Sequence, residues 1–235
     1  MLCPVLDERS RYYDEMVAAG DWDSKTNPFE TRRRLELIYN VLLPDEDLSG
    51  KRLLDGGSGG GHFSQVANER GAEVTSLDVG ENLLAQVAKR CDTRRVLGSV
   101  LDLPFETDSF DIVLSTEVIE HTPDPRQGIR ELCRVVRPGG ILVLTSPNRL
   151  WQPVVRGATR LKLRTYAGHE NFLWAGEASE QVAAAGLTVE TLLGFNALPL
   201  FRPFFEAALA WADRLGERFP GGYVNWAIRA RKPGI

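Results

Sequence analysis

The sequence has few of the residues that build disulfide frameworks or structural metal sites. Its 235 residues include only three cysteines and three histidines. Cys3, Cys91 and Cys133 are odd in number and widely spaced, and no Cys-x-x-Cys or Cys/His metal pattern occurs. Reduced thiols in an intracellular protein are the simplest interpretation. The hydrophobic fraction of 43% is enough to fill a core in a chain of this length.

An excess of charge of one sign is also missing. The chain has 28 Lys and Arg residues against 32 Asp and Glu residues, a formal net charge of −4. The basic residues are scattered, so the sequence contains no patch suited to a nucleic-acid backbone. The short basic cluster at residues 32–34 is interpreted as the solvated face of a helix. Nucleic acid is therefore not expected as a partner.

Long apolar runs are absent as well, since none approaches the ~20 residues needed to span a bilayer. The first stretch, MLCPVLDERSRYYDE, has no apolar core of signal-peptide length, so a cytoplasmic location is expected. The most apolar stretch, residues 198–212, is interrupted by Arg202, Pro203 and Glu206. As a helix it could lie on a membrane surface or pack over a substrate entrance, and packing is favoured.

Short apolar strands alternate with amphipathic helices between about residues 51 and 147. This order predicts a parallel sheet that is covered by helices on both faces. Strands are predicted at 52–57, 73–79, 95–100, 110–118 and 141–146, and helices at 62–71, 81–91 and 129–136. The third of these helices is expected to stop at Pro138-Gly139-Gly140.

The stretch LLDGGSGGGHF joins the first strand to the first helix and contains five glycines in six positions. A glycine turn here lets the backbone approach a ligand and places the helix N-terminus beside it. Asp55, Gly57, Gly59 and Gly61 form D-x-G-x-G-x-G, whereas a dinucleotide fingerprint would need glycine where His62 stands. The pattern favours a nucleotide-like ligand other than a nicotinamide dinucleotide. A tight turn without a ligand is the alternative.

Two acidic residues follow the next two strands. Asp78 ends the second strand, where a carboxylate can accept hydrogen bonds from both ribose hydroxyls. Asp102 follows the third strand, where a carboxylate could accept from an adenine amino group. Either residue alone could simply cap a helix or a turn. Together they predict a site for adenosine.

These motifs resemble those of a known family. LLDGGSGGG, SLDV, GSVLDLPFETDSFDIVLSTEVIEH and VVRPGGILVLTSPN, in this order, are similar to the motif set of class I S-adenosylmethionine-dependent methyltransferases. The segments YYDEMVAAGDWDSKTNPFETRRRLELI, GFNALPL and GYVNWAIRARKP resemble the ubiquinone-biosynthesis O-methyltransferase branch. Gly56 and Ser58 depart from the family pattern, which usually has an apolar residue and Cys or Thr, but both substitutions are small.

The resemblance implies an α/β, Rossmann-like fold. Its seven-stranded sheet would be mostly parallel, with helices on both faces, a helical lid and an antiparallel last strand. No internal repeat or low-complexity linker divides the chain, so a single methyltransferase domain over residues 1–235 is expected. Its expected parts are a helical preface or lid (1–50), a cofactor-binding core (51–147), an acceptor-side cap (148–222) and the last strand (223–235).

The resemblance also implies S-adenosylmethionine as the cofactor. The glycines of the turn would admit its methionine portion, and Asp55 would orient the amino group through the turn. Asp78 would hold the ribose and Asp102 the adenine, and Glu117 or Ser115 would line the methionine side. The full set expected at the cofactor is Asp55, Gly57, Ser58, Gly59, Gly61, Asp78, Val79, Asp102, Leu103 and Glu117.

Residues for the chemistry are harder to identify, because methyl transfer mainly requires a nucleophile held in line with an activated methyl group. The E-x-x-E-H sequence of Glu117, Glu120 and His121 resembles one that binds a divalent metal, Mg²⁺, Mn²⁺ or Zn²⁺, in related enzymes. His121 as a general base and a structural role for the pair Glu120 and His121 are the alternatives. His169 could be a base, a fourth metal ligand or a loop histidine.

The expected activity is methyl transfer to a small-molecule acceptor, most consistent with a hydroxyl oxygen. N- and C-methyltransferases share every cofactor motif above and stay open as alternatives. A non-catalytic protein that binds S-adenosylmethionine is a further alternative. The oligomeric state does not follow from the sequence.

Overall fold

The computed structural model describes residues 28–44, 46–160, 170–196 and 219–234. In this part of the chain the strands are β1 Arg52–Gly56, β2 Glu73–Asp78, β3 Arg94–Leu97, β4 Phe110–Thr116, β5 Val136–Pro147, β6 Thr188–Phe195 and β7 Asn225–Arg231. The α-helices are α2 Pro28–Glu36, α3 His62–Glu69, α4 Glu81–Arg90, α5 Pro125–Val135, α6 Gln152–Arg160 and α7 Ala175–Ala184. A π-helical segment, Leu37–Leu42, continues α2, and short 3-10 helices lie at Ile119–His121, Arg149–Trp151 and Pro220–Gly222.

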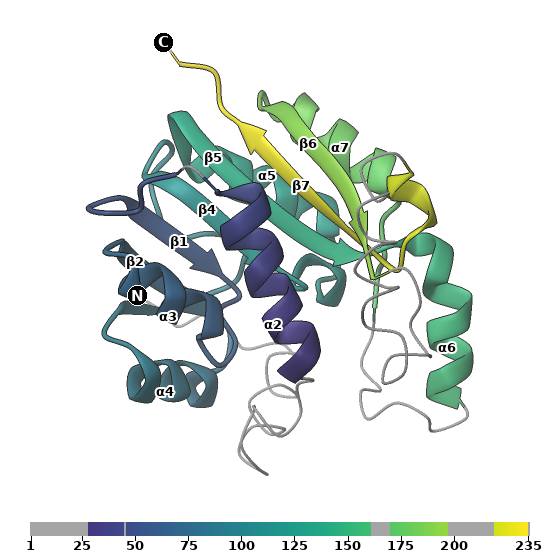
Figure 1. Cartoon of the computed structure of the whole chain (residues 1–235), viewed down its shortest axis with the longest axis horizontal. Coiled ribbons are helices and arrows are strands. Elements are labelled where there is room, and N and C mark those ends of the chain that lie inside the picture. The colour runs from purple at the N-terminus through teal and green to yellow at the C-terminus, as the bar shows by residue number, and fades with distance from the viewer. Residues whose placement is uncertain (1–27, 45, 161–169, 197–218, 235) are drawn as a thin grey trace.

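The strands form one sheet in the order β3-β2-β1-β4-β5-β7-β6 (Figure 1). Strands β1 to β5 pair in parallel, and β7 runs antiparallel to both of its neighbours, β5 and β6. This confirms the predicted seven-stranded, mostly parallel sheet with an antiparallel last strand. The strand order reverses between β1 and β4. In an open α/β sheet, the carboxyl ends of the strands at such a reversal form the usual ligand crevice.

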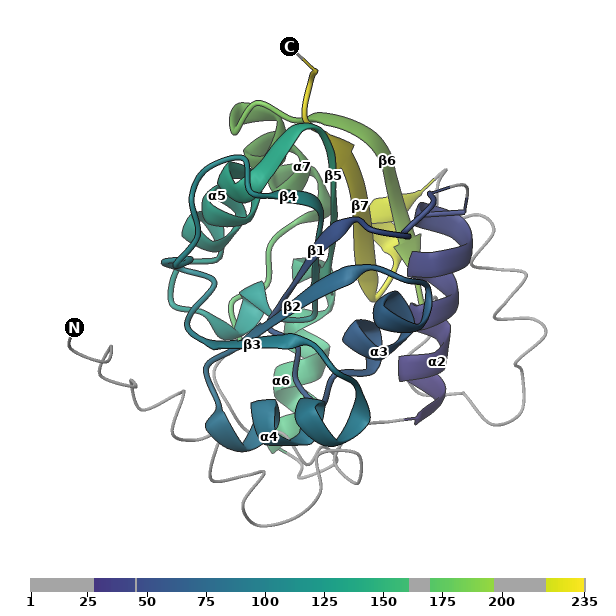
Figure 2. The same ribbon diagram turned by 90° about the vertical axis from the view of Figure 1, so that its left-hand side faces the viewer.

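Helices cover both faces of the sheet (Figure 2). On one face, α5 and α7 pack over a cluster of buried side chains that includes Leu132, Val182 and Trp226. On the other face, α3 and the π-helical segment after α2 pack over a second cluster that includes Tyr39 and Phe63. The sheet is thus buried on both sides, as its near-continuous apolar strands require.

Local sequence signals explain several element boundaries. Asp124 accepts a hydrogen bond of 3.0 Å from the backbone N of Gln127 and so caps α5, which has Pro125 in its first turn. The structure ends α5 at Val135 and begins β5 at Val136, so Pro138-Gly139-Gly140 lies inside the strand. The prediction that these three residues stop the helix was wrong, because the backbone is already extended at Val136.

Within the predicted helical preface, residues 28–42 are helical, and they are tied to the glycine-turn region. Tyr39 Oη donates a hydrogen bond of 2.6 Å to the carbonyl oxygen of Phe63 in α3. The Arg70 guanidinium lies 4.9 Å from the centre of the Tyr39 ring. These contacts hold the segment after α2 against α3, so that α2 extends beside the carboxyl ends of the strands (Figure 1).

The sequence left residues 148–222 without assigned elements, and the structure finds α6, α7 and β6 there. Two of these, α7 and β6, belong to the layers of the sheet rather than to a cap over the acceptor. Residues 198–212, with their predicted role at the entrance or on a membrane, lie outside the described residues. No helix in the described ranges is both long and apolar enough to cross a membrane.

Candidate active site

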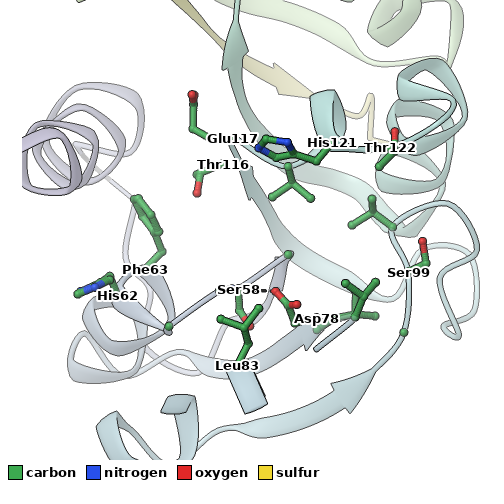
Figure 3. A pocket seen from close by; sticks show the side chains of 18 of the residues that line it. Ser58, His62, Phe63, Asp78, Leu83, Ser99, Thr116, Glu117, His121 and Thr122 are labelled. Carbon is green, nitrogen blue, oxygen red and sulfur yellow. Dashed lines mark hydrogen bonds between the residues drawn. The ribbon is translucent and has the colours of Figure 1, made fainter. Parts of the chain in front are cut away.

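A cavity of about 290 Å³ opens at the carboxyl ends of β1, β2 and β4 (Figure 3). Its volume is at the lower end of the range for small-molecule sites, roughly 300–1,000 Å³. Three groups of residues line it: the glycine turn and the start of α3, the ends of β2 and β3, and the end of β4 with the residues after it. Helix α2 adds Thr31 and Arg34 to the wall.

The glycine turn adopts a backbone conformation that favours glycine. Gly57, Gly59 and Gly61 have φ values of 82°, 51° and 83°, which L side chains rarely adopt. A Cβ atom at Gly57 would lie only 2.4 Å from Cγ2 of Val118. The backbone N atoms of Gly57 and Ser58 both donate to the carbonyl oxygen of Leu77, at 2.8 and 2.9 Å. The turn is therefore fixed close to the end of β2.

Ser58 offers a hydrogen-bonding group to a ligand. Its side chain is 5% exposed and lines the cavity, and its Oγ atom has no hydrogen-bond partner in the structure. A buried hydroxyl without a partner is costly unless a ligand or water satisfies it. Helix α3 begins four residues later, and its N-cap, Gly61, has no side chain to bond the first turn. Both features suit a polar ligand beside the turn.

Asp78 ends β2 and lines the cavity with 6% exposure. Its Oδ2 accepts a hydrogen bond of 2.9 Å from the backbone N of Gly59, and its Oδ1 accepts one of 3.1 Å from Gly80. An ionised carboxylate has about four acceptor positions. These contacts fix the side chain at the cavity wall, where a carboxylate can accept hydrogen bonds from a ligand. Val79 also lines the cavity, as the sequence predicts.

Asp102 does not lie at the cavity. The third strand ends at Leu97, earlier than the sequence predicts, and the chain then turns so that Asp102 N donates to the carbonyl oxygen of Ser99 at 3.2 Å. This turn leaves Asp102 exposed and brings Ser99 to the cavity wall. The geometry therefore does not support the predicted contact of Asp102 with adenine. Among the residues that directly follow β3 and line the cavity, Ser99 is the one with a polar side chain.

Two other predicted cofactor contacts, Asp55 and Leu103, lie behind the cavity wall and do not line it. The Asp55 carboxylate is fully buried, and its Oδ2 accepts a hydrogen bond of 2.6 Å from Ser64 Oγ. Burial raises the pKa of Asp55 from 3.8 to about 6. Ser115, the alternative named with Glu117, is also buried and donates to the carbonyl oxygen of Gly56 at 2.9 Å.

Glu117 lies directly after β4 and lines the cavity. Its φ of 56° is unusual for a residue with a side chain, and its carboxylate is held on both oxygens. Thr145 Oγ1 donates to Oε1 at 2.9 Å, and Asn225 Nδ2 donates to Oε2 at 2.7 Å. Burial raises the pKa of Glu117, while the positive charge of Arg34 opposes this rise.

His121 and Glu120 have different positions relative to the cavity. His121 lines it, whereas Glu120 is 1% exposed and does not. Ser146 Oγ donates to Glu120 Oε2 at 3.1 Å, and Glu120 Oε1 lies 3.7 Å from Nε2 of His121. Burial, and then the neighbouring charge of Glu117, raise the Glu120 pKa well above its ordinary value. His169 lies outside the described residues.

The E-x-x-E-H residues do not fit the metal site that the resemblance implies. Within the described residues, no three His, Cys, Asp or Glu side chains are grouped so that they could hold a metal ion. The oxygens of Glu117 are engaged by Thr145 and Asn225, and Glu120 is directed toward Ser146 in the interior. A metal ion would have to displace these internal hydrogen bonds.

Sequence reasoning missed several residues of the wall. Arg34 was interpreted as part of a solvated helix face, yet it is half-buried and lines the cavity. Phe63, Leu83, Thr116 and Thr122 line it as well. Phe63 and Leu83 lie in the first turns of α3 and α4, the helices that follow β1 and β2, and an apolar residue at this place in each helix could have indicated them. The side of α2 that meets the cavity depends on packing that the sequence pattern does not reveal.

Comparisons with known proteins agree with this geometry. Residues 54–144 match a family model described as a methyltransferase domain. A ubiquinone biosynthesis O-methyltransferase of Xanthomonas oryzae pv. oryzae is 34% identical over 224 residues, which cover 89% of this chain and 88% of the relative. One from Pseudomonas fluorescens is 32% identical over 209 residues, covering 83% of this chain and 89% of the relative.

A solved structure from Thermotoga maritima, described as an S-adenosylmethionine-dependent methyltransferase and possible histamine N-methyltransferase, shares the fold. It has a TM-score of 0.68 and 17% sequence identity, covering 95% of this chain and 97% of that chain. The strand order is that of a Rossmann-like fold, and the cavity with the glycine turn lies at its topological switch point. The chain belongs to the class I S-adenosylmethionine-dependent methyltransferases, and within them it is similar to the ubiquinone-biosynthesis O-methyltransferases.

Proposed function

We propose that this enzyme transfers the methyl group of S-adenosylmethionine to a hydroxyl oxygen of a small molecule. The observation that carries the proposal is the polar wall of Glu117 and His121, which faces the cavity at the end of β4 beside the glycine turn. The relatives named as O-methyltransferases, which match more than four fifths of the chain, support oxygen as the acceptor atom.

The cavity suggests where each part of the cofactor would bind. The ribose would lie at Asp78, which ends β2 and presents a carboxylate, an acceptor suited to ribose hydroxyls, at the cavity wall. The methionine portion would lie over Gly57, Gly59 and Gly61, with the Ser58 hydroxyl bonded to it. The purine would lie beyond Asp78, beside the residues that follow β3.

The amino-acid end of the cofactor carries one positive and one negative group. Glu117 and Arg34, which both line the cavity, offer a charge of each sign close enough to affect each other. Arg34 is suited to the carboxylate, because a guanidinium can bond both of its oxygens. Glu117 is suited to the ammonium group. The pair would therefore orient the cofactor in one direction along the cavity.

S-adenosylmethionine supplies an already activated methyl group, so the protein must mainly hold the acceptor in line behind it. For a hydroxyl acceptor, the oxygen forms the new bond to carbon and its proton must leave. His121 is proposed to take that proton, since an imidazole ordinarily titrates near ~6.5 and this ring faces the cavity. Glu120 cannot reach the acceptor and would instead hold the ring at Nε2, 3.7 Å away.

No step of this proposal uses a metal ion, because the carboxylate groups of Glu117 and Glu120 accept hydrogen bonds from other side chains of the protein. If a metal ion did polarise the acceptor, a chelator would abolish methyl transfer and Mg²⁺ or Zn²⁺ would restore it. A rate that is unchanged in chelator would support the metal-free mechanism. A cytoplasmic location stays a prediction from the sequence.

The test is an acceptor screen with methyl-labelled S-adenosylmethionine, using phenols, including hydroxylated ubiquinone precursors, and amines as matched acceptors. A methyl ether as the product would support the proposal, and methylation of nitrogen or carbon only would contradict it. On an accepted phenol, His121→Ala is expected to lower kcat by roughly 10²- to 10⁴-fold. Its affinity for S-adenosylhomocysteine, measured by calorimetry, should stay close to that of the unchanged protein.

A further inference from the structure

Four residues that directly follow β3 line the cavity wall beyond Asp78, and among these four only Ser99 has a polar side chain. Gly98, Ser99, Val100 and Leu101 line the wall there, directly after β3. Figure 3 places Ser99 on the far side of Asp78 from His62 and Phe63, at the end where the purine of the proposed cofactor would lie. Among the described residues that follow β3 along this wall, a hydroxyl therefore takes the place of the expected carboxylate.

Asp102 is held away from this position. The residue that follows it, Leu103, is fixed on both sides of its backbone: its N donates to Glu131 Oε2 at 3.0 Å, and its carbonyl oxygen accepts from Arg134 Nη2 at 3.0 Å. Glu131 and Arg134 are also paired with each other at 2.8 Å. Asp102 itself donates its backbone N to the carbonyl oxygen of Ser99. These contacts fix the backbone at Asp102 and Leu103 in the turn that leaves the Asp102 side chain exposed.

The Ser99 hydroxyl has one hydrogen-bonding position already in use. Its Oγ accepts a hydrogen bond of 3.2 Å from the backbone N of Leu101. A hydroxyl has one proton to donate and two lone pairs, so Ser99 keeps its proton and one lone pair. It can accept from an amino group, and it can equally donate to an oxo group or a ring nitrogen. An ionised carboxylate can only accept.

We infer that Ser99 contacts the 6-position edge of the purine, and that the site selects only weakly for the 6-amino group of the cofactor. This inference rests on the cofactor placement in the proposed function. A carboxylate at this place would lose its hydrogen-bond donor if the amino group were absent, and a buried charged acceptor without a partner is costly. The Ser99 hydroxyl avoids that cost because it can rotate to donate instead.

The test measures three ligands by calorimetry on the full chain: S-adenosylhomocysteine, the analogue with an unsubstituted purine, and S-inosylhomocysteine, which has a 6-oxo group. Both analogues are expected to bind within about ten-fold of S-adenosylhomocysteine, a difference of about 1.4 kcal/mol. A loss of more than ten-fold for the unsubstituted purine would overturn the inference. Failure of S-adenosylhomocysteine itself to bind would overturn both the inference and the cofactor placement.

Two variants separate Ser99 from Asp102. Ser99→Asp places a carboxylate at the 6-position edge of the purine. The affinity for S-inosylhomocysteine, relative to that for S-adenosylhomocysteine, should be at least ten-fold lower in this variant than in the unchanged protein. Asp102→Asn, the matched control on the exposed side, should leave that ratio unchanged. If only Asp102→Asn changes the ratio, Asp102 contacts the purine and the inference is wrong. If Ser99→Asp does not fold, the ratio of the affinities for S-inosylhomocysteine and S-adenosylhomocysteine in the unchanged protein still tests whether the site selects only weakly for the 6-amino group.

Discussion

Asn225, at the start of β7, donates a hydrogen bond of 2.7 Å from Nδ2 to Oε2 of Glu117 on the cavity wall. The two residues are 108 positions apart in the sequence. They meet because β7 is antiparallel: its first residue pairs with Pro147 at the carboxyl end of β5. The amino end of the antiparallel strand β7 therefore lies at the same end of the sheet as the carboxyl ends of the parallel strands.

Replacing Asn225 with Ala should lower activity by releasing one oxygen of Glu117. A hydrogen bond to a charged group contributes about 1.5–3 kcal/mol, so kcat/KM is expected to fall roughly ten- to one-hundred-fold. Asn196→Ala is the matched control, because Asn196 Nδ2 bonds Oδ1 of Asn225 at 2.9 Å but not Glu117 itself. Its effect should be smaller. Equal activity of both variants and the unchanged enzyme would show that Thr145 alone holds Glu117.

The positions of Asp78 and Asp102 can be tested as a pair. Asp78→Ala should weaken the binding of S-adenosylhomocysteine by about 1.5–3 kcal/mol, because the lost carboxylate would no longer bond the ribose. Asp102→Ala should leave the affinity unchanged, since Asp102 is exposed and does not line the cavity. Calorimetric titration of both variants checks this. If Asp102→Ala bound S-adenosylhomocysteine more weakly while Asp78→Ala bound it normally, Asp102 and not Asp78 would be the residue that contacts the cofactor.

The fold of the core was predictable because its signals are local. Strands β1, β2, β4 and β5 carry apolar runs, and the glycine-rich stretch after β1 marks the turn in which Gly57, Gly59 and Gly61 have positive φ. Strand β6 and helix α7 were not located. Strand β6 is exposed or only half-buried over its first five residues, so its apolar pattern is weak although it pairs with β7 along its whole length.

The site was predictable where a backbone conformation determines it, and less so where a side chain's direction does. Asp78 is the last residue of its strand and lines the cavity, and its contact with the ribose stays a prediction. Asp102 follows its strand after a turn whose course depends on Glu131 and Arg134 of α5. Arg34 lies on a helix whose orientation depends on the packing of Tyr39 against α3. Neither of these long-range constraints is visible in a local pattern.

Gly57→Ala should destabilise the glycine turn. The left-handed conformation costs a residue with a Cβ atom about 1–2 kcal/mol, and the new methyl group would lie 2.4 Å from Val118. The free energy of unfolding, measured by chemical denaturation, and the affinity for S-adenosylhomocysteine should both fall. Gly176→Ala, in α7 with no atom within 4 Å of its would-be Cβ, is the control and should be neutral or slightly stabilising. Normal binding by Gly57→Ala would show that Val118 can move aside.

Asp55 gives the enzyme a stability that depends on pH. The carboxyl group is fully buried beneath the glycine turn, and a chain of hydroxyls continues from it: Ser64 Oγ lies 2.8 Å from Ser76 Oγ, which lies 3.0 Å from Thr93 Oγ1. Burial disfavours the charged form and raises the pKa of Asp55 from 3.8 to about 6. The folded state therefore binds the proton more tightly than the unfolded state does.

The sign of the effect follows from this difference. The stabilisation is fully present below pH 3.8 and is lost as the pH rises through about 6, a loss on the order of 3 kcal/mol. The Asp55→Asn variant has no charge to bury, so its free energy of unfolding should not show this loss as the pH rises. The measurement is the free energy of unfolding of both proteins at about pH 4 and pH 7. Other groups change the stability in the opposite direction with pH, such as Glu131, whose pKa is lowered by its hydrogen bond with Arg134. Their contributions are the same in both proteins and cancel when the two free energies of unfolding are subtracted. A parallel pH dependence of the two proteins would mean that the Asp55 carboxylate is stabilised in its charged form, contrary to its buried position.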